Sequence, residues 1–259
     1  MSPNRIPAWL FCLFLGLASV GCHTAVKRSM FGTEQYDTVF VCNGALASYS
    51  FRMNAVNALK HGNGFADNVN SDMVRRFFGK EGIGIREAME QYAADEAARF
   101  SGWNAGVVGN LSYGEVIPHL SNRETNIETV IEERSYRGVA GVHFVRTDVT
   151  GGMEAACTVL CSNYSLKDGH RLTLDGFFDG EACDVCETFL SLLEKKLPES
   201  GLPVNNVYFD EDNLFVTDNY IFRSDAVVFF FNGQDIGIPS PETVSVEIGY
   251  DELPFGIRR

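Results

Sequence analysis

The sequence is short of positive charge. It has 259 residues, of which 21 are Lys or Arg and 34 are Asp or Glu, so its formal net charge is −13. A chain this acidic is repelled by phosphate, which excludes nucleic acid as a partner and favours cationic ones. Apolar residues make up 45% and charged residues 21%, which excludes both a disordered chain and one built mostly of membrane spans. The length predicts one or two domains with a substantial core.

The signatures of common catalytic sites are also missing. The five histidines are scattered, and no two have the spacing of an H-E-x-x-H zinc motif. No serine lies in a G-x-S-x-G setting. The acidic run Asp210-Glu211-Asp212 lacks the glycine and the closing glutamate of a calcium loop. These absences favour a non-catalytic protein without a cofactor or a bound metal.

What is present begins with an N-terminal targeting segment. One positive charge, Arg5, precedes an apolar run from about Ala8 to Val20, which is followed by small residues and a cysteine. This is the pattern of a secretory signal. The run is too short to cross a bilayer, since a core of about 30 Å needs ~20 helical residues. We therefore predict that residues 1–21 are a signal peptide.

The end of this segment, Ala18-Ser19-Val20-Gly21-Cys22, resembles a bacterial lipobox, with Ser19 where an aliphatic residue is usual. On this interpretation Cys22 is lipidated and holds the protein on a membrane. Cleavage nearby without lipidation is the alternative. Because His23 follows in place of the Asp that retains such proteins in the inner membrane, we expect the protein to be secreted across the inner membrane and anchored in the outer membrane of a Gram-negative envelope. Residues 22–36 have no clear periodicity and are predicted to be a tether.

Hydrophobic periodicity predicts about three helices. Apolar side chains recur at helical spacing between residues 66 and 78, and Gly79 sits where a C-terminal glycine belongs. A second stripe covers residues 85–100 and includes one charged residue, Glu96. A third covers residues 182–197.

Runs rich in β-branched and aromatic residues predict strands in the rest of the chain. The Asp-Gly turn at Lys167–His170 is expected to join two of them as a hairpin. The predicted strands are 38–41, 46–51, 107–113, 129–136, 141–147, 157–166, 171–174, 206–209, 213–217, 220–222, 226–232 and 243–250.

No internal repeat, low-complexity tract or linker divides the chain. The fold class expected is therefore α+β, with antiparallel sheets packed against the helices. The division expected is an N-terminal subdomain over residues 37–166 and a C-terminal subdomain over residues 167–259, closely packed together.

Four cysteines could carry chemistry or cross-links. Cys183 and Cys186 lie at a predicted helix start, where the helix dipole lowers a thiol pKa, as a thiol-redox pair requires. Cys157 and Cys161 on one strand would be about 13 Å apart, too far to share one zinc ion unless a bulge intervenes. A four-cysteine zinc site with Cys183 and Cys186 is therefore the alternative that needs such a bulge. In an oxidising compartment the simplest interpretation is a disulfide between a strand cysteine and a helix cysteine, with Cys42 as a buried apolar residue.

The order of features in the C-terminal third resembles a known family. An extended HRLTLDGFFDG segment at residues 170–180 is followed by the predicted helix, by residues 207–237 and by VSVEIGYDEL at residues 244–253. This resembles the domain of unknown function 3298, found in bacterial envelope lipoproteins and in the extracellular part of the RsiV-type anti-sigma factor. Residues 37–166 resemble its usual partner domain, also found in PdaC-type peptidoglycan deacetylases. Met153-Glu154 replaces the family's Ala-His, and Gln234 and Ser240 replace its tyrosines.

The resemblance implies a ligand surface on the C-terminal strands. Alternation along 226–232 sends Phe229 and Phe231 to one face of the sheet. The sharper interpretation is an exposed aromatic groove; the plainer one is that the rings are buried on both faces. The candidate ligand residues are Phe229, Phe231, Asn232, Asp235 and Tyr250.

The function expected is a non-catalytic binding or sensing domain of the cell envelope. The resemblance implies cell-wall glycan (peptidoglycan) or a cationic lysozyme-like protein as its ligand. The first alternative is a periplasmic hydrolase or a thiol-redox enzyme using Cys183 and Cys186, which requires a pocket where histidine or reactive cysteine meets carboxylates. The second is a structural assembly subunit, which requires an exposed apolar patch and self-association.

Overall fold

We describe the protein from a computed structural model. Residues 1–29, among them the predicted signal peptide, Cys22 and most of the predicted tether, lie outside the residues that the structure describes. The described residues are 30–57, 62–110, 122–151, 155–197, 199, 216–233 and 243–258.

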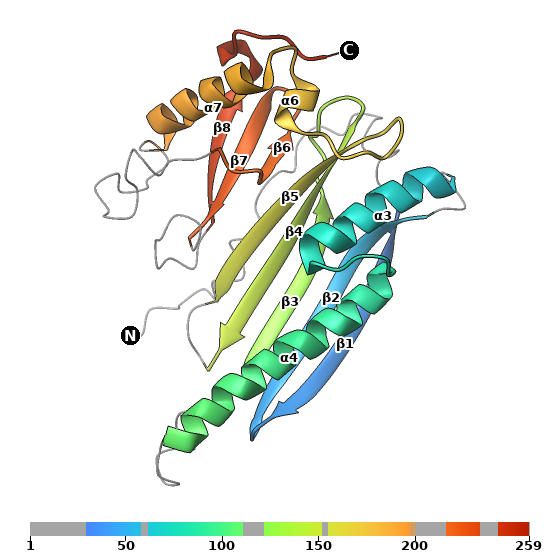
Figure 1. Ribbon diagram of the computed structural model, residues 1–259, viewed down its shortest axis with the longest axis vertical. Helices are drawn as coiled ribbons and strands as arrows, with labels where there is room; N and C mark the ends of the chain where they lie inside the picture. The colour runs from blue at the N-terminus through green and yellow to red at the C-terminus, as the bar shows by residue number, and fades with distance from the viewer. Residues whose placement is uncertain are drawn as a thin grey trace, which may run out of the picture.

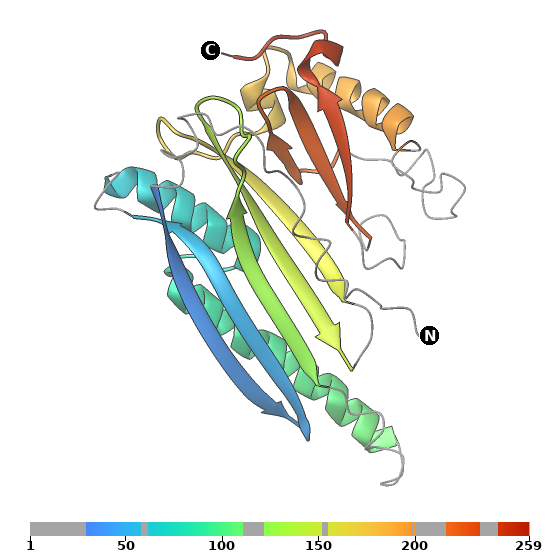
Figure 2. The ribbon, with the colours of Figure 1, turned by 180° about the vertical axis from the view of Figure 1, so that it is seen from behind.

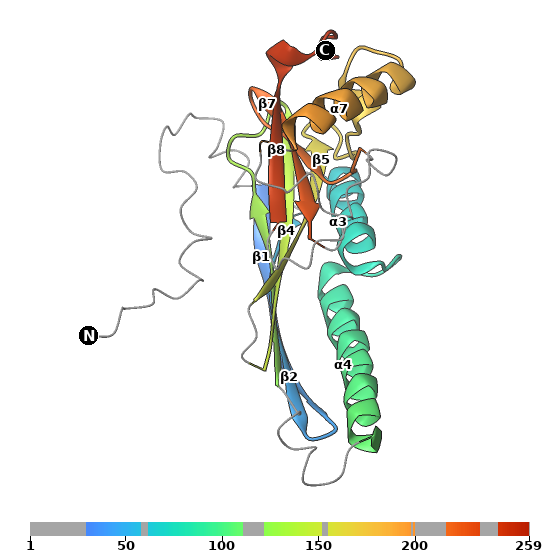
Figure 3. The ribbon, with the colours of Figure 1, turned by 90° about the vertical axis from the view of Figure 1, so that its left-hand side faces the viewer.

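The elements form two sheets with all the long helices on one side (Figures 1 and 3). Their bounds are β1 Phe31–Cys42, β2 Ala45–Val56, α3 Asn63–Phe78, α4 Ile85–Asn110, β3 Arg123–Ile131, β4 Val139–Thr150, β5 Ala156–Ser165, α6 Leu174–Phe177, α7 Ala182–Lys196, β6 Tyr220–Phe222, β7 Ala226–Asn232, β8 Thr243–Gly249 and the 3₁₀ turn η4 Tyr250–Glu252.

The large sheet has the order β1-β2-β3-β4-β5. Three of its pairings are antiparallel, but β2 and β3 are parallel, with Ala47 opposite Arg123. Parallel neighbours need a crossover, and here α3 and α4 make it along one face of the sheet (Figure 1). The α+β class is confirmed, and the large sheet is mixed where an antiparallel one was expected.

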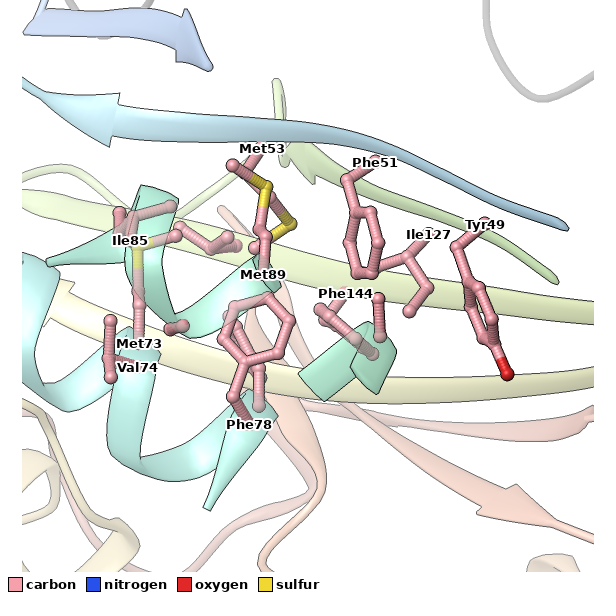
Figure 4. Packing of buried hydrophobic residues seen from close by; sticks show 14 of the residues in the cluster. Tyr49, Phe51, Met53, Met73, Val74, Phe78, Ile85, Met89, Ile127 and Phe144 are labelled. Carbon is pink, nitrogen blue, oxygen red and sulfur yellow. The ribbon is translucent and has the colours of Figure 1, made fainter. Parts of the chain in front are cut away.

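The core of the large sheet forms where the helices cover it. Odd-numbered residues of β2 point at α3 and α4, and Phe51 and Met53 are fully buried there. Met73 of α3 and Met89 of α4 meet them from the helix side (Figure 4). Gly79 ends α3 in the left-handed conformation, with φ 65°, as the sequence predicts.

Two ends of this unit differ from expectation. β1 begins at Phe31, so residues 31–36, expected to be tether, are paired with β2. Because β1 is an edge strand, most side chains of residues 31–36 are exposed. The sequence there lacks the alternation of apolar and polar residues by which a strand is predicted. Residues 107–110, expected to start a strand, continue α4. The tertiary contacts of the last turns, where Trp103 stacks on Phe100 and Asn104 donates to the carbonyl of Cys42, outweigh the β propensity there.

The small sheet is antiparallel, in the order β6-β7-β8, and α7 packs against it. Phenylalanine is the commonest residue in its core. Residues 174–177, of which Leu174 was expected to end a strand, form the short helix α6, because Thr173 accepts a hydrogen bond from the N–H of Gly176 as its N-cap. The predicted Lys167–His170 turn is present, with Gly169 at φ 76°, but only the single bridge Tyr164↔Arg171 follows it.

Asparagine side chains join the two sheets. Asn163 of β5 accepts from the N–H of Phe222 and donates to the carbonyl of Tyr220. From the other side, Asn232 accepts from the N–H of Val159, 2.8 Å away, and donates to its carbonyl. Each sheet thus satisfies backbone groups of the other through an asparagine side chain, although β5 and the strands of the small sheet do not pair. None of the helices in the described part of the chain is both long and apolar enough to cross a membrane.

Candidate functional site

The face of the large sheet opposite α3 and α4 is not covered by a helix of the described structure. The views from behind and from the side show no described helix or strand over β1–β3 on this side (Figures 2 and 3). The first half of β4 is covered there by the small sheet, where Phe230 packs against the ring of His143. A shallow hollow of about 290 Å³ lies at its centre. We call this surface the outer face; the residues that line its hollow are Gln35, Asp37, Ser50, Phe51, Arg52, Asn126, Ile127, Glu128, Val145 and Thr147.

Strand alternation explains why this face is polar. The same period that buries Phe51 and Ile127 under the helices sends their neighbours in the chain to the other side. Asp37 and Glu128 are both exposed there. Ser50 donates to Asp37 across the β1–β2 pair, 2.7 Å from Oγ to Oδ1. The face therefore presents two carboxylates with hydrogen-bonding side chains around them, and one cation, Arg52, opposite Glu128 in the strand register.

A buried charge network lies on the opposite side of the same sheet, under α4. Arg146 donates to Asp148, to Glu96 and to the hydroxyl of Tyr92. Arg123 also donates to Asp148, at 3.0 Å. Burial raises the pKa of Asp148, but the charge of Arg146 and its hydrogen bond outweigh burial and lower it. The network anchors α4 to β3 and β4, and Glu96 within an otherwise apolar stripe was its signal in the sequence.

A second cluster brings a thiol, an imidazole and a carboxylate together near the junction of the sheets. The Sγ of Cys161 is 3.5 Å from Nδ1 of His143, and Nε2 of His143 is 3.2 Å from Oε2 of Glu132. Arg223 donates to the same carboxylate oxygen at 3.2 Å. The ring of Phe230 packs edge-on against His143. This is the convergence that the hydrolase alternative requires.

Burial argues against nucleophilic chemistry in this cluster. Cys161 is 1% exposed, and burial raises the pKa of its thiol well above the usual range. Burial also raises the pKa of Glu132, but hydrogen bonds from His143 and from the N–H of Arg134, with the charge of Arg223, outweigh it and lower the pKa to about 2. The carboxylate is thus ionised, while the buried thiol is held in its protonated form.

The cysteines do not meet as predicted. No disulfide joins the cysteines that the structure describes. Cys161 lies buried against His143, whereas Cys183 and Cys186 are exposed on the first turn of α7. Cys183 donates to Glu187, and this hydrogen bond, together with the carboxylate charge, raises its thiol pKa. The lowering expected from the helix N-terminus is therefore reversed, because i, i+4 spacing places a carboxylate next to the thiol.

The predicted ligand surface is mostly interior. Phe229 and Phe231 are 0% and 1% exposed in the core of the small sheet, and Asn232 is engaged with Val159. Tyr250 is half-buried, and its hydroxyl donates to the carbonyl of Arg223. Asp235 lies outside the described residues. The aromatic-groove interpretation was therefore wrong for the two phenylalanines, because alternation turns both rings toward α7.

Metal ligands do not gather in the described part of the chain, where no group of three or more His, Cys, Asp or Glu side chains could hold an ion. Sequence reasoning did not find Asp37 or Glu128. Their strands are readable from the sequence, but which face the helices leave uncovered depends on the crossover of α3 and α4.

Comparison with solved structures finds the same fold in several chains, among them the following two. One is a member of the DUF3298 family from Bacteroides fragilis, with a TM-score of 0.62 and 19% sequence identity over 87% of this chain and 93% of that chain. The other is a DUF3298 family protein from Pseudomonas aeruginosa, with a TM-score of 0.50 and 11% identity over 88% of this chain and 94% of that chain. At such identities the likeness establishes a shared fold. No protein-family model and no curated protein matches the sequence.

Proposed function

We propose that this chain is a DUF3298-type domain of the bacterial cell envelope that binds a cationic protein of lysozyme type and carries out no catalysis. The outer face of the large sheet is the observation that carries the proposal. It is open over β1–β3 of the described structure and exposes Asp37 and Glu128 beside a hollow. Complementary charge on a partner speeds encounter with such a face and fixes the orientation of binding.

A cationic protein fits this face better than cell-wall glycan does. Sugar rings bind by stacking on exposed aromatic side chains together with hydrogen bonds, and the only aromatic residue lining the hollow, Phe51, is itself 1% exposed. Carboxylates, in contrast, pair with Lys and Arg. The net charge of −13 acts in the same direction by drawing cationic proteins toward the whole molecule.

The proposal includes a lipid anchor at Cys22. After secretion across the inner membrane, this anchor holds the domain on a membrane of the envelope. Its support is the signal pattern of residues 1–21 and the cysteine that follows. Expressed in a Gram-negative host, the natural chain is expected in the outer-membrane fraction. The Cys22→Ser chain is expected in the soluble periplasmic fraction, and an unchanged membrane location would contradict the anchor.

The binding test uses hen-type lysozyme and purified peptidoglycan as separate probes, with the full chain carrying Cys22→Ser so that it stays in solution. The double variant Asp37→Asn with Glu128→Gln is expected to weaken lysozyme binding roughly tenfold, a loss of about 1.4 kcal/mol. The matched control is Glu194→Gln, which removes an exposed carboxylate on α7. Binding measured by calorimetry is also expected to weaken as salt is raised.

Each other outcome rejects a stated part of the proposal. If the chain binds peptidoglycan and not lysozyme, and the double variant loses this binding, the ligand of the outer face is the glycan and not a cationic protein. If Glu194→Gln weakens lysozyme binding as much as the double variant does, the overall charge of the chain, and not the outer face, is responsible for the binding. No binding to either probe would reject the function.

A further inference from the structure

The free edge of the large sheet belongs to β1, and no described strand pairs with its outer side. A tight Asn43-Gly44 turn joins Cys42 to Ala45, with φ of 50° and 90°. The even-numbered residues of β1 therefore bond to β2, and the odd-numbered ones point their N–H and C=O groups outward. The carbonyl of Gln35 confirms this direction, because it accepts a hydrogen bond from outside the sheet, from Arg86 at 2.6 Å.

The two halves of this edge differ in their charge and in the hydrogen bonding of their outward groups. In the first half, Glu34 and Asp37 are charged. Arg86 donates a hydrogen bond to the carbonyl of Gln35, and its guanidinium lies over the ring of Tyr36. Charges and capped carbonyls are the usual protection of an edge strand against pairing with another chain. The second half, Thr38–Cys42, has no charge, proline or glycine, and its register with β2 runs without a bulge.

Apolar side chains are exposed at the unprotected half. Val39 and Val41 are 60% and 79% exposed on the outer face, and Leu46, opposite Val41 in the register, is 45% exposed. These are three of the five large apolar side chains that the described structure leaves exposed. We call Thr38–Cys42 together with Leu46 the open edge.

We propose that the open edge pairs antiparallel with the open edge of a second copy of this chain. A two-fold axis at Phe40 places Val39 opposite Val41 of the second copy, so that outward N–H and C=O groups meet in matching pairs. The same step covers the exposed valines of both copies. Because the segment has no charge, it offers nothing to a charged peptide but is complementary to itself.

Size and charge set the strength of this contact. One short strand pair with a few apolar side chains lies at the low end of specific interfaces, so we expect a dimer dissociating at roughly 10–100 μM. Each copy carries −13, and salt screens their repulsion. Dimerisation is therefore expected to strengthen with salt, opposite to the binding of a cationic protein, so failure of one proposal is distinguishable from failure of the other.

The test is sedimentation equilibrium of the full chain with Cys22→Ser, from about 1 to 500 μM. Val41→Lys is expected to weaken the dimer at least tenfold. The matched control, Val130→Lys, changes a valine that is 45% exposed on the outer face of β3, and is expected to leave the dimer unchanged. Circular dichroism verifies that both variants fold.

Hydrogen exchange tests the register without any substitution. The edge-facing amides of Val39 and Val41 are expected to exchange more slowly as the protein concentration rises, while that of Thr33, in the protected half, does not change. A chain that stays monomeric throughout overturns the proposal. So does a dimer that survives Val41→Lys, one that Val130→Lys disrupts equally, or one that leaves the amides of Val39 and Val41 unprotected.

Discussion

The two hydrophobic cores of the molecule are built from different side chains. Between the large sheet and α3 and α4, aromatic rings are mixed with alanine, valine and methionine, and Met53, Met73 and Met89 are fully buried (Figure 4). Under α7, six of the fifteen buried residues of the described cluster are phenylalanine, and none is methionine or alanine. The fully buried ring of Phe178 alone lies within 6.1 Å of the rings of Phe177, Phe189, Phe222, Phe255 and Tyr250.

This difference follows from the number of elements available. Two long helices on five strands supply many surfaces, so small and unbranched residues let them approach closely and flexible methionine fills the gaps. Three strands with one long helix supply few surfaces, and large rings with edge-to-face contacts fill the volume. A run of phenylalanines in this chain therefore marks a small core rather than a ligand groove.

The largest effect is expected from truncating a ring of the aromatic core. Phe178→Ala removes contacts with five rings and should lower the free energy of unfolding by about 4 kcal/mol, whereas Met89→Leu should cost under about 1.5 kcal/mol because the methionine core can repack. Urea unfolding followed by circular dichroism measures both.

The same experiment tests whether the two cores unfold together. Trp103 at the end of α4 is the only tryptophan outside the predicted signal peptide, so its fluorescence follows the large sheet alone. We expect Phe178→Ala to shift the Trp103 transition together with the circular dichroism transition. A Trp103 midpoint equal to that of the natural chain would show that the cores are independent.

A smaller loss of stability is expected from breaking the asparagine hydrogen bonds that join the two sheets. Asn232→Ala removes the acceptor of the Val159 N–H, which is part-buried, and should cost about 2 kcal/mol. Asn126→Ala removes an amide exposed on the outer face and should cost under about 0.5 kcal/mol. If thermal unfolding shows the same loss of stability for Asn232→Ala and Asn126→Ala, the asparagine hydrogen bonds between the sheets have no structural role.

The smallest effect, and the only one that depends on pH, is expected at Glu132, which connects β3 to Arg223 of the small sheet. Its folded pKa of about 2 lies below the ordinary 4.5, so its charge stabilises the fold above pH 4.5 and progressively less as the pH falls toward 2. Glu132→Gln should therefore cost about 1–2 kcal/mol at pH 7 and much less at pH 2.

Denaturant unfolding at the two pH values measures this difference against the natural chain. The control is Asp251→Asn, an exposed carboxyl that takes part in neither core. Its effect should be small at both pH values. A Glu132→Gln penalty of the same size at pH 7 and at pH 2 would mean that shape, not charge, makes the contact.

Elements with a local pattern could be predicted from the sequence, and those set by distant partners could not. The stripes of α3 and α7, the Gly79 cap and the strands β6 to β8 follow from periodicity within a few residues. The parallel pairing of β2 with β3 has no local signal. Nor does the burial of Asn232, which depends on the small sheet lying beside β5.

The candidate site was harder to predict than the fold for the same reason. Asp37 lies next to the predicted strand 38–41, and Glu128 next to the strand 129–136, so both were outside the elements that alternation revealed. Phe229 and Phe231 had the expected alternation, but periodicity gives a shared face and not what covers it. Only the packing of α7 decides that this face is interior.

The parallel pairing of β2 with β3 also determines the order in which the chain can fold. Leu46 and Asn122, joined by a hydrogen bond at this pairing, are 76 positions apart, whereas the β1–β2 hairpin closes through two residues. Local hairpins form in microseconds, and long-range pairing waits for the chain between to be organised. The hairpin should therefore form first, while α3 and α4 are still unpacked, and expose its apolar side until they cover it. During that interval the nascent protein is most exposed to aggregation, so the lag between hairpin and crossover determines how much of it depends on chaperones.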